Sequence, residues 1–197
     1  VPVAVSAFGE EQLKDLQANT VEGLQGAVPN MNIAQGRGSA NSVIVSIRGI
    51  GQPDALQTFD PGVGMYVDDV YYSRINGALF SLFDIAQLEV LRGPQSTSLG
   101  RNALAGAIVV NTRNPADYWE AGIRARISEN NTRQLNAMLN APLAENLAAR
   151  LVLEDSSSDG FVNNTRNTAT TTDDVPDWAA SRQQMARLKL GLTNTAQ

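Results

Sequence analysis

The feature that most constrains this chain is an alternation of apolar and polar residues that sets in after Pro115. Ile123, Ala125 and Ile127 alternate with two arginines and a serine, as expected of a strand with one apolar and one polar face. The pattern recurs in three further segments, over residues 134–140, 147–154 and 186–192. A soluble antiparallel sheet produces it with the apolar face on a core, and a membrane β-barrel produces it with that face in lipid.

The connections between these segments differ in length. Residues 129–133 and 142–146 are short connections, whereas residues 155–181 form a long polar stretch. Membrane barrels combine short periplasmic turns with long extracellular loops, so an ascending first segment would place the long connection outside the cell. Tyr118 and Trp119 precede the first segment, where an aromatic girdle would lie, although aromatic residues also flank ordinary strands.

Composition excludes several classes of function. The 197 residues are enough for a core of one or two domains. They include no cysteine and no histidine, which disfavours disulfides, zinc enzymes and histidine-based triads. The formal charge of −5, with its positive residues dispersed, makes nucleic acid an unexpected partner. Of 15 positive residues only Lys14 and Lys189 are lysines, and this arginine bias hints at buried ion pairs.

Glycine usage divides the chain near Pro115, because thirteen of the 16 glycines precede residue 116. We therefore expect one domain over residues 1–115 and a second over residues 116–197. In the first, local patterns predict helices over residues 10–16 and 21–27, the latter with Thr20 as N-cap and Pro29 as its stop. The predicted strands of this small α+β domain cover residues 1–5, 31–34, 43–47, 63–67, 70–72, 88–91 and 107–111.

Two of these strands end in the same dipeptide, Arg48-Gly49 and Arg92-Gly93. Each places a long cation where the backbone must turn, which suits a side chain projecting from the sheet toward a carboxylate outside the domain. The simpler interpretation is an exposed arginine at a strand end, and composition alone favours it.

Several motifs in fixed order resemble the TonB-dependent outer-membrane receptors over nearly the whole chain. The opening VPVAVSAFGEEQL resembles the start of their plug domain, and VIVSIRGIGQ resembles its central strand. PGVGMYVDDVYYSR resembles a plug hairpin, and LFDIAQLEVLRGPQSTSLGRNALAGAIVVNTRNP resembles the second half of the plug. Asp69 replaces the glycine of the family's usual Val-Asp-Gly turn, which weakens the turn preference without changing the expected fold.

The resemblance implies an α+β plug domain, a small mixed sheet with short helices, over residues 1–115. Residues 116–197 would then be about the first four antiparallel transmembrane strands of a 22-stranded plugged β-barrel. Four strands cannot close a barrel, and an open edge is not viable in lipid. We therefore expect this chain to be a fragment of a longer protein that also has a signal peptide and an upstream segment that contacts TonB.

The function implied by the resemblance is uptake of a scarce solute across the bacterial outer membrane, with the plug gating the barrel. The expected partners are TonB with its inner-membrane energising complex, outer-membrane lipid and, as solute, most often a ferric siderophore. Vitamin B12, saccharides, haem and other metal chelates remain open as solutes. No enzyme activity, cofactor, catalytic residue or metal site is expected.

The resemblance also implies roles for particular residues. Arg48 and Arg92 would latch the plug to glutamates on the inner barrel wall, outside this chain, and Glu89 is a further candidate for that network. The plug loops over residues 35–41, 51–59 and 73–77 would form apices that touch the ligand. The polar candidates in and beside them are Arg37, Gln52, Arg74 and Asn76, for which ordinary surface loops are the alternative.

Competing interpretations of the motifs are weaker. Residues 93–101 are bounded by glycine but lack the lysine and the Ser/Thr of a phosphate-binding loop. Asp68 and Asp69 could suggest a cation site, yet further oxygen ligands are not signalled nearby, and a solvated turn is the expected reading. Two alternatives remain for the whole chain: a soluble α+β ligand-binding module, and a hydrolase that works through carboxylate pairs.

Overall fold

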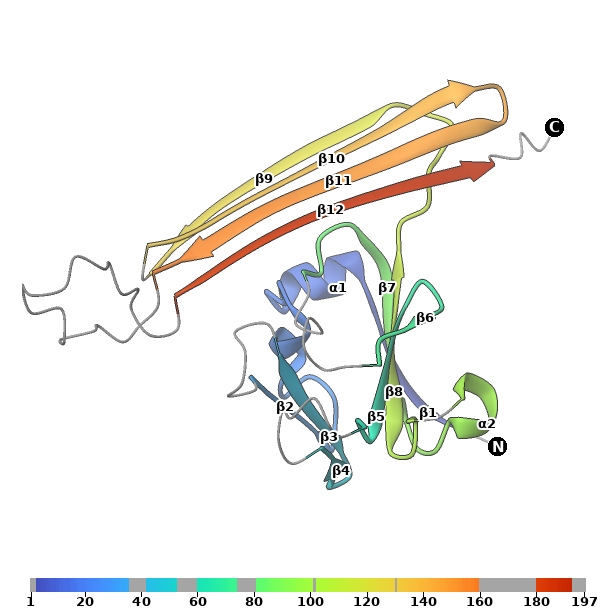
Figure 1. The fold of residues 1–197 in the computed structure, drawn as a ribbon, viewed down its shortest axis with the longest axis vertical. Coiled ribbons are helices and arrows are strands. Elements are labelled where there is room, and N and C mark those ends of the chain that lie inside the picture. Colours follow the sequence, from blue (N-terminus) through green and yellow to red (C-terminus); the bar gives the residue numbers. More distant parts are fainter. Residues whose placement is uncertain are drawn as a thin grey trace, which may run out of the picture. The chain divides into compact units, whose positions relative to one another are not determined.

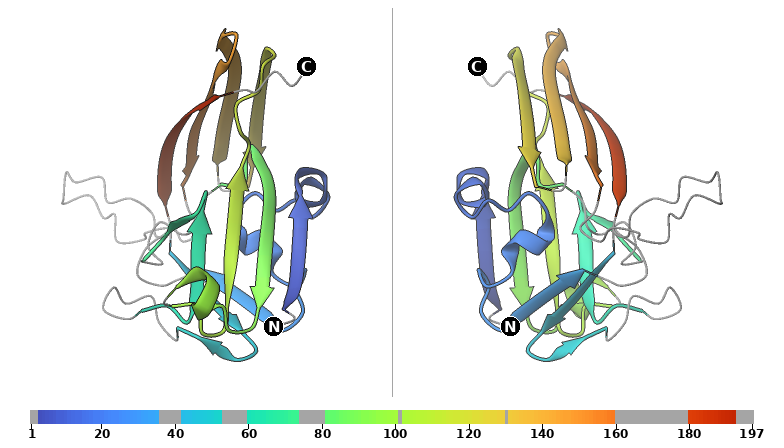
Figure 2. Two further views of the ribbon diagram at one scale, coloured as in Figure 1. Left: turned by 90° about the vertical axis from the view of Figure 1, so that its right-hand side faces the viewer. Right: turned by 90° about the vertical axis from the view of Figure 1, so that its left-hand side faces the viewer.

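A computed structural model describes residues 3–35, 42–52, 60–73, 81–100, 102–129, 131–159 and 180–192. The chain forms two compact units, Val1–Arg113 and Asn114–Gln197. Figures 1 and 2 show the helices and strands of both, and each unit is described by itself.

The first unit is built on a five-stranded mixed sheet. In spatial order its strands are β1 (Ala4–Gly9), β7 (Ile85–Arg92), β8 (Gly106–Thr112), β5 (Val63–Val67) and β6 (Val70–Tyr71). β5 pairs with β8 in parallel, and the other neighbours are antiparallel. The predicted strands over residues 63–67, 88–91 and 107–111 are confirmed. The first strand was predicted over residues 1–5, of which residues 1 and 2 lie outside the described ranges, and it continues to Gly9.

A smaller three-stranded sheet and two short helices pack against one face of this sheet. The strands are β2 (Met31–Gln35), β3 (Val43–Ile47) and β4 (Ile50–Gly51), and the helices are α1 (Glu10–Asp15) and the 3-10 helix η1 (Val21–Leu24). One continuous core joins them, since Leu24, Ile47, Leu88 and Ile108 are all fully buried in it. In Figure 2, β1, β7, β8 and β5 lie next to one another.

The second helix is shorter than predicted and of another type. The predicted apolar stripe is confirmed, because Val21, Leu24 and Val28 are 0%, 0% and 2% exposed. However, η1 ends at Leu24, and Thr20 makes no side-chain cap; it forms an isolated β-bridge with Ser81 instead. Gly26, with φ +83°, has a left-handed backbone that no α-helix continues through.

The stretch between β7 and β8 is tied to the other face of the large sheet. It contains α2 (Ser96–Leu99), which the sequence pattern did not predict. The buried Tyr66 hydroxyl donates a hydrogen bond to the Leu99 carbonyl at 2.8 Å, and Asn102 Nδ2 donates to the Tyr71 hydroxyl oxygen at 2.7 Å. The two tyrosine rings lie 5.3 Å apart, so two neighbouring strands of the sheet anchor this loop.

The Asp68-Asp69 hairpin joins β5 and β6, as predicted. Both aspartates have positive φ, 47° and 65°, which a type I′ turn requires and which Asp tolerates better than most residues. The expectation of a merely solvated turn was wrong for Asp68. Its carboxylate accepts hydrogen bonds from the Thr112 N–H at 2.8 Å and from Thr112 Oγ1 at 2.7 Å, which fixes the turn to the end of β8.

The second unit is a four-stranded antiparallel sheet. Its strands are β9 (Glu120–Ser128), β10 (Thr132–Ala144), β11 (Leu147–Ser158) and β12 (Ser181–Leu192), in the spatial order β12-β11-β10-β9. Figure 1 shows them as long neighbouring arrows. All four segments predicted from the alternation are therefore confirmed as strands.

Candidate functional site

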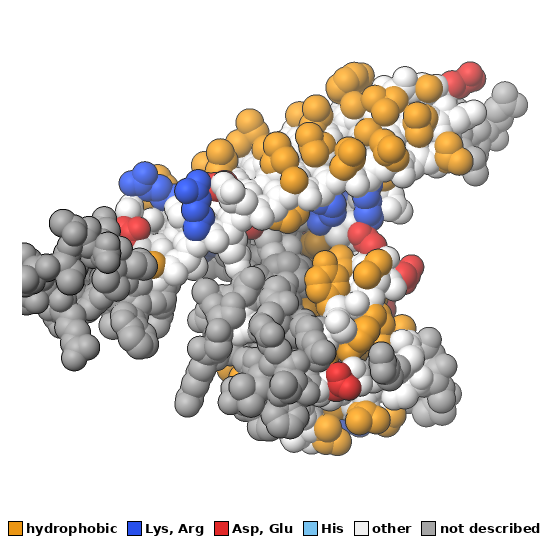
Figure 3. All heavy atoms as spheres, viewed as in Figure 1, with side chains coloured by type: hydrophobic (Ala, Val, Ile, Leu, Met, Phe, Trp, Pro, Cys, Tyr) orange, Lys and Arg blue, Asp and Glu red, His pale blue; other side chains and the backbone are white. Residues whose placement is uncertain are grey.

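The four-stranded sheet separates its side chains into two chemically different faces. One face exposes nine large apolar side chains, between 43% and 83% accessible: Ile123, Ile127, Leu135, Leu139, Leu143, Leu153, Leu188, Leu190 and Leu192. Figure 3 shows hydrophobic side chains along much of this sheet and basic side chains toward one end. We call this the apolar face. Its length and continuity exceed what a water-exposed sheet normally shows.

The opposite, polar face carries buried polar groups. Asn136, Asn140, Arg150 and Glu154 are each at most 9% exposed. Arg150 Nη1 lies 2.9 Å from Glu120 Oε2, with the Arg150 side chain 2% and the Glu120 side chain 35% exposed. The arginine bias suggested buried ion pairs, and this pair has a buried cation and a half-buried carboxylate. Within the described ranges, Asn136 Oδ1 and Glu154 Oε2 are buried acceptors without a hydrogen-bond partner.

Residues 114–119 lead into β9 and are held on the polar face. Asn140 Oδ1 accepts from the Ala116 N–H at 3.0 Å, and Asn140 Nδ2 donates to the carbonyls of Ala116 and Tyr118. Lys189 Nζ lies 3.4 Å from Asn114 Oδ1. One amide therefore replaces the strand partner that this connecting segment lacks, and we call residues 114–119 the strap.

Arg92, a predicted latch residue, is the last residue of β7 and is paired in register with Gly106. It points to the same face as the fully buried Leu88 and Val90, because side chains two apart share a face. Its Nε is buried and has no hydrogen-bond partner among the residues that the structure describes. Such a donor is costly unless a partner outside those residues satisfies it.

Arg48, the other predicted latch residue, occupies the turn between β3 and β4. Arg48 and Gly49 have φ 53° and 79°, and the Arg48 N–H donates to the Asn30 carbonyl at 2.8 Å. The side chain is exposed, and within the described part of the chain no carboxylate forms a salt bridge with it. The turn thus presents a guanidinium outward from the small sheet.

Glu89, the third residue of the predicted network, is not brought together with Arg92. The two residues are three apart on β7 and therefore project from opposite faces. Glu89 Oε1 instead accepts a hydrogen bond from Gln87 Nε2 at 2.9 Å.

The predicted ligand-contacting residues fall mostly outside the described ranges, namely Arg37, Arg74 and Asn76. Gln52 is described, directly after β4, and is only 5% exposed. The structure thus places this glutamine inside the first unit rather than at an exposed loop tip.

An ionic cluster joins the beginning and the end of the first unit. Glu10, at the start of α1, forms salt bridges with Lys14 at 2.5 Å and with Arg113 just after β8. Partial burial opposes ionisation of Glu10, but the hydrogen bonds and charges of Lys14 and Arg113 outweigh it and hold the pKa of this carboxyl below its usual value. For Tyr66, burial disfavours the ionised form and raises the pKa of the hydroxyl above its usual value.

Several of these contacts had no signal in the sequence. Asn140 and Arg150 read only as polar positions of alternating strands, and their partners lie 24 and 30 residues away. Tyr66 and Asp68 read as ordinary members of a hairpin. Within the described ranges, no cluster of three His, Cys, Asp or Glu side chains could hold a metal ion. No helix there combines the length and apolar character needed to cross a bilayer.

Comparison with known proteins identifies relatives of both units. Residues 1–107 match the family described as TonB-dependent Receptor Plug Domain. The pesticin receptor of Yersinia pestis is 27% identical over 191 residues, which cover 96% of this chain and 27% of that protein. The iron-regulated outer membrane virulence protein of Vibrio cholerae is 24% identical, over 80% of this chain and 25% of that protein. The chain spans about a quarter of the length of these relatives.

Solved structures agree with this relationship. The ferric yersiniabactin uptake receptor FyuA from Yersinia pestis matches with a TM-score of 0.83 at 25% identity, over 97% of this chain and 29% of that one. The ferric-catecholate import receptor Fiu from E. coli K12, in its open form, shares the fold with a TM-score of 0.58 at 21% identity, over 80% of this chain and 22% of that one. Because the family match extends over more than half of the residues of this chain, the chain belongs to the TonB-dependent receptor plug domain family.

Proposed function

We propose that the chain comprises the plug, residues 1–115, and the first four barrel strands, residues 116–197, of a transporter in the bacterial outer membrane. The observation that supports this most is the apolar face of the second unit, which exposes nine large hydrophobic side chains. A lipid-facing barrel surface requires such a face, with the polar face toward the lumen. A plugged barrel of 22 strands would supply the partners for the two sheet edges.

The dimensions of the apolar face fit this proposal. On β10 it extends from Leu135 to Leu143. At about 3.3 Å per residue and a tilt near 40°, this run covers about 20 Å along a bilayer normal. That is close to the height of about 25 Å typical of the apolar band of outer-membrane barrels.

The proposed substrate class is ferric siderophores, taken up by TonB-coupled active transport in which the plug gates the barrel. The relatives support it: one is named as a ferric yersiniabactin receptor and another as a ferric-catecholate receptor. In this proposal TonB and its inner-membrane complex supply the energy. Arg48 and Arg92 belong to a network that holds the plug, with Glu89 as a further member from the opposite face of β7. Arg37, Arg74 and Asn76 contact the ligand, whereas the burial of Gln52 argues against a direct contact by that residue.

The direct test is uptake by cells that produce the full-length natural protein and lack their own siderophore receptors. ⁵⁵Fe carried by yersiniabactin and by a catecholate siderophore should enter with the receptor present and should not enter an otherwise identical strain without TonB. Uptake that persists without TonB would contradict energy coupling. Binding without uptake of either complex would leave the receptor assignment standing and overturn the proposed substrates.

A soluble α+β binding module is the alternative, and detergent separates the two. A soluble module would cover the apolar face with its own core. If the full-length protein partitions into water and stays monodisperse without detergent, the transporter proposal is wrong.

A further inference from the structure

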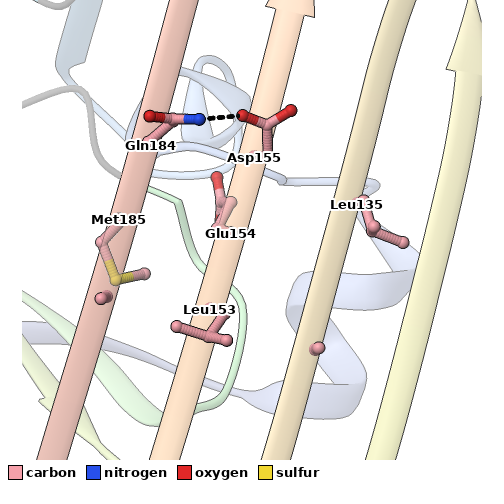
Figure 4. Close-up of a pocket in the computed structure, with 8 residues that line it drawn as sticks. Leu135, Leu153, Glu154, Asp155, Gln184 and Met185 are labelled. Atoms are coloured by element: carbon pink, nitrogen blue, oxygen red, sulfur yellow. Dashed lines mark hydrogen bonds between the residues drawn. The ribbon is translucent and has the colours of Figure 1, made fainter.

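A hollow of about 480 Å³ opens across β10, β11 and β12 of the second unit (Figure 4). Its lining residues are Leu135, Ala137, Leu153, Glu154, Asp155, Gln184, Met185 and Ala186. Six of these eight alternate onto the apolar face, the exceptions being Glu154 and Met185.

Small side chains explain the hollow. Ala137, Leu153 and Ala186 form one cross-strand row, in which an alanine flanks the leucine on each side. The next row of the same face, at the end away from Asp155, contains a leucine at all three positions: Leu139, Leu151 and Leu188. A surface lined by methyl groups between bulkier rows is suited to a hydrocarbon chain, because the chain fills space that neighbouring side chains leave empty.

Two arginines lie on the same face, beyond the polar margin of the hollow. Arg133 pairs in register with Ser157, and Ser157 pairs with Arg182. Neighbouring strands are about 4.8 Å apart, so the two arginines are about 10 Å apart with a serine hydroxyl between them. Two guanidinium groups at this spacing can converge on one phosphate, a geometry for which arginine is well suited.

The arginine row and the row between it and the hollow contain two guanidinium groups and one carboxylate. Asp155 lies between the arginine row and the hollow, where it accepts a hydrogen bond from Gln184 Nε2 at 2.7 Å and lies 3.7 Å from Arg182 Nη2. Arg133 donates from Nε and Nη2 to Asn131 Oδ1 at 3.2 and 3.0 Å, and this amide partner carries no charge. The row of Arg133, Ser157 and Arg182 and the neighbouring row that contains Asp155 therefore have two positive charges and one negative charge between them. Asp159 and Glu129 follow further along, outside these rows, and Asp159 accepts from Asn131.

We propose that the row formed by Arg133, Ser157 and Arg182 binds the phosphate of a bilayer lipid. The phosphate lies between Arg133 and Arg182, with Ser157 as an additional donor, and one acyl chain occupies the hollow beside Leu153. Charge complementarity favours an anionic lipid over a zwitterionic one, because the positive group of a zwitterionic headgroup would meet the two arginines. The inference rests on the proposed function, since it requires the apolar face to lie in lipid.

The experiment titrates the detergent-purified, delipidated full-length protein with dioleoyl phosphatidic acid or dioleoyl phosphatidylcholine and counts bound lipids by native mass spectrometry. The wild type should bind one phosphatidic acid at least tenfold more tightly than phosphatidylcholine. R133Q and R182Q should each weaken phosphatidic acid binding about fivefold, as expected for one basic residue near a lipid phosphate, with little effect on phosphatidylcholine. Both arginines are exposed strand residues, so folding should be preserved.

Two further variants sharpen the test. R126Q removes an arginine from the adjacent strand β9, at nearly the same level of the sheet as Arg133 but on the polar face. This variant should keep the full preference for phosphatidic acid over phosphatidylcholine. A137L fills the hollow and should weaken the binding of both lipids to the same extent. A wild type without preference, or an R133Q/R182Q variant with the wild-type preference, would overturn the inference. A protein that needs detergent but shows no preference contradicts only this inference, whereas one soluble without detergent contradicts the proposed function too.

Discussion

At the scale of single residues, a nearby backbone atom explains why position 106 is a glycine. A Cβ at this position would overlap the Leu91 carbonyl oxygen, whereas a Cβ at Gly9 would meet nothing within 4 Å. Backbone atoms cannot move aside cheaply, so G106A should destabilise the β7–β8 pairing by about 2 kcal/mol or more. Hydrogen exchange of the β7 and β8 amides in the full-length receptor should be about 30-fold faster. G9A is the matched control, and equal protection in both variants would contradict this account.

Glu10 predicts a pH dependence of the first unit. Its pKa in the fold lies below the usual 4.5 because of Lys14 and Arg113, so its ionised form stabilises the fold at pH above 4.5. This contribution is lost as the pH falls through the lowered pKa. E10Q should therefore show a smaller loss of stability between pH 5 and pH 3 than the wild type, as measured by thermal unfolding of the full-length receptor. E11Q, which alters the exposed neighbour, should retain the wild-type pH dependence; an equal change in both variants would count against the Glu10 cluster.

Arg48 and Arg92 carry the latch proposal. Removing one partner of a buried charge pair leaves the other uncompensated, at a cost of about 3–5 kcal/mol. R92A and R48A should loosen the plug and raise passive entry of a large antibiotic into cells that produce the full-length receptor. The Nε of Arg92, buried without a described partner, makes R92A the stronger of the two. R133A, which removes an arginine from the apolar face, should leave permeability unchanged, and unchanged permeability in all three would contradict the latch.

At the scale of elements, the strap turns a connecting segment into part of the sheet. Asn140 is 0% exposed and makes three hydrogen bonds to the backbone of residues 116 and 118. N140A should cost about 3 kcal/mol, since each buried backbone group left unsatisfied costs about 1–3 kcal/mol. The Ala116 amide should lose its protection from hydrogen exchange, while N146A, at the exposed turn between β10 and β11, should leave it protected. Protection that survives N140A would show that other contacts hold the strap.

The regular strands could be predicted from sequence because their signal is local. Alternation predicts β9 to β12 wherever one face is apolar, and runs such as residues 63–67 mark the strands of the plug. The second helix was mispredicted because its apolar stripe, Val21, Leu24 and Val28, suits a 3-10 helix followed by turns as well as an α-helix. α2 and β4 are four and two residues long, too short for any periodicity to show.

The contacts at the candidate site are less predictable because they join distant residues. The arginine bias suggested buried ion pairs, but it could not indicate Arg150, the buried arginine, or its half-buried partner Glu120. The Arg48 turn was recognisable from Arg-Gly, since the glycine allows a positive φ. The separation of Glu89 and Arg92 onto opposite faces follows from strand geometry and could have been predicted from their spacing of three residues.

At the scale of the whole molecule, the two units differ in where they place their large apolar side chains. The first buries a continuous hydrophobic core of its own, as a plug must if it is to stay folded inside a barrel. The second exposes nine large apolar side chains on one face of its sheet, more than a water-exposed sheet normally shows. In the proposed transporter, lipid would cover the apolar face of the sheet and the lumen would hydrate its polar face.

The most direct test of this central claim is a spin-label accessibility scan of β9 and β12 in the full-length protein, freed of other cysteines and reconstituted in phosphatidylcholine bilayers. Single cysteines would replace Ile123, Ile127, Leu188 and Leu190 on the apolar face, and Arg124, Arg126 and Arg187 on the polar face. We expect accessibility to dissolved oxygen to be high at the apolar positions and low at the polar ones, with a period of two residues. Apolar positions that are instead accessible to a water-soluble nickel complex, or buried from both reagents, would contradict a lipid-facing sheet.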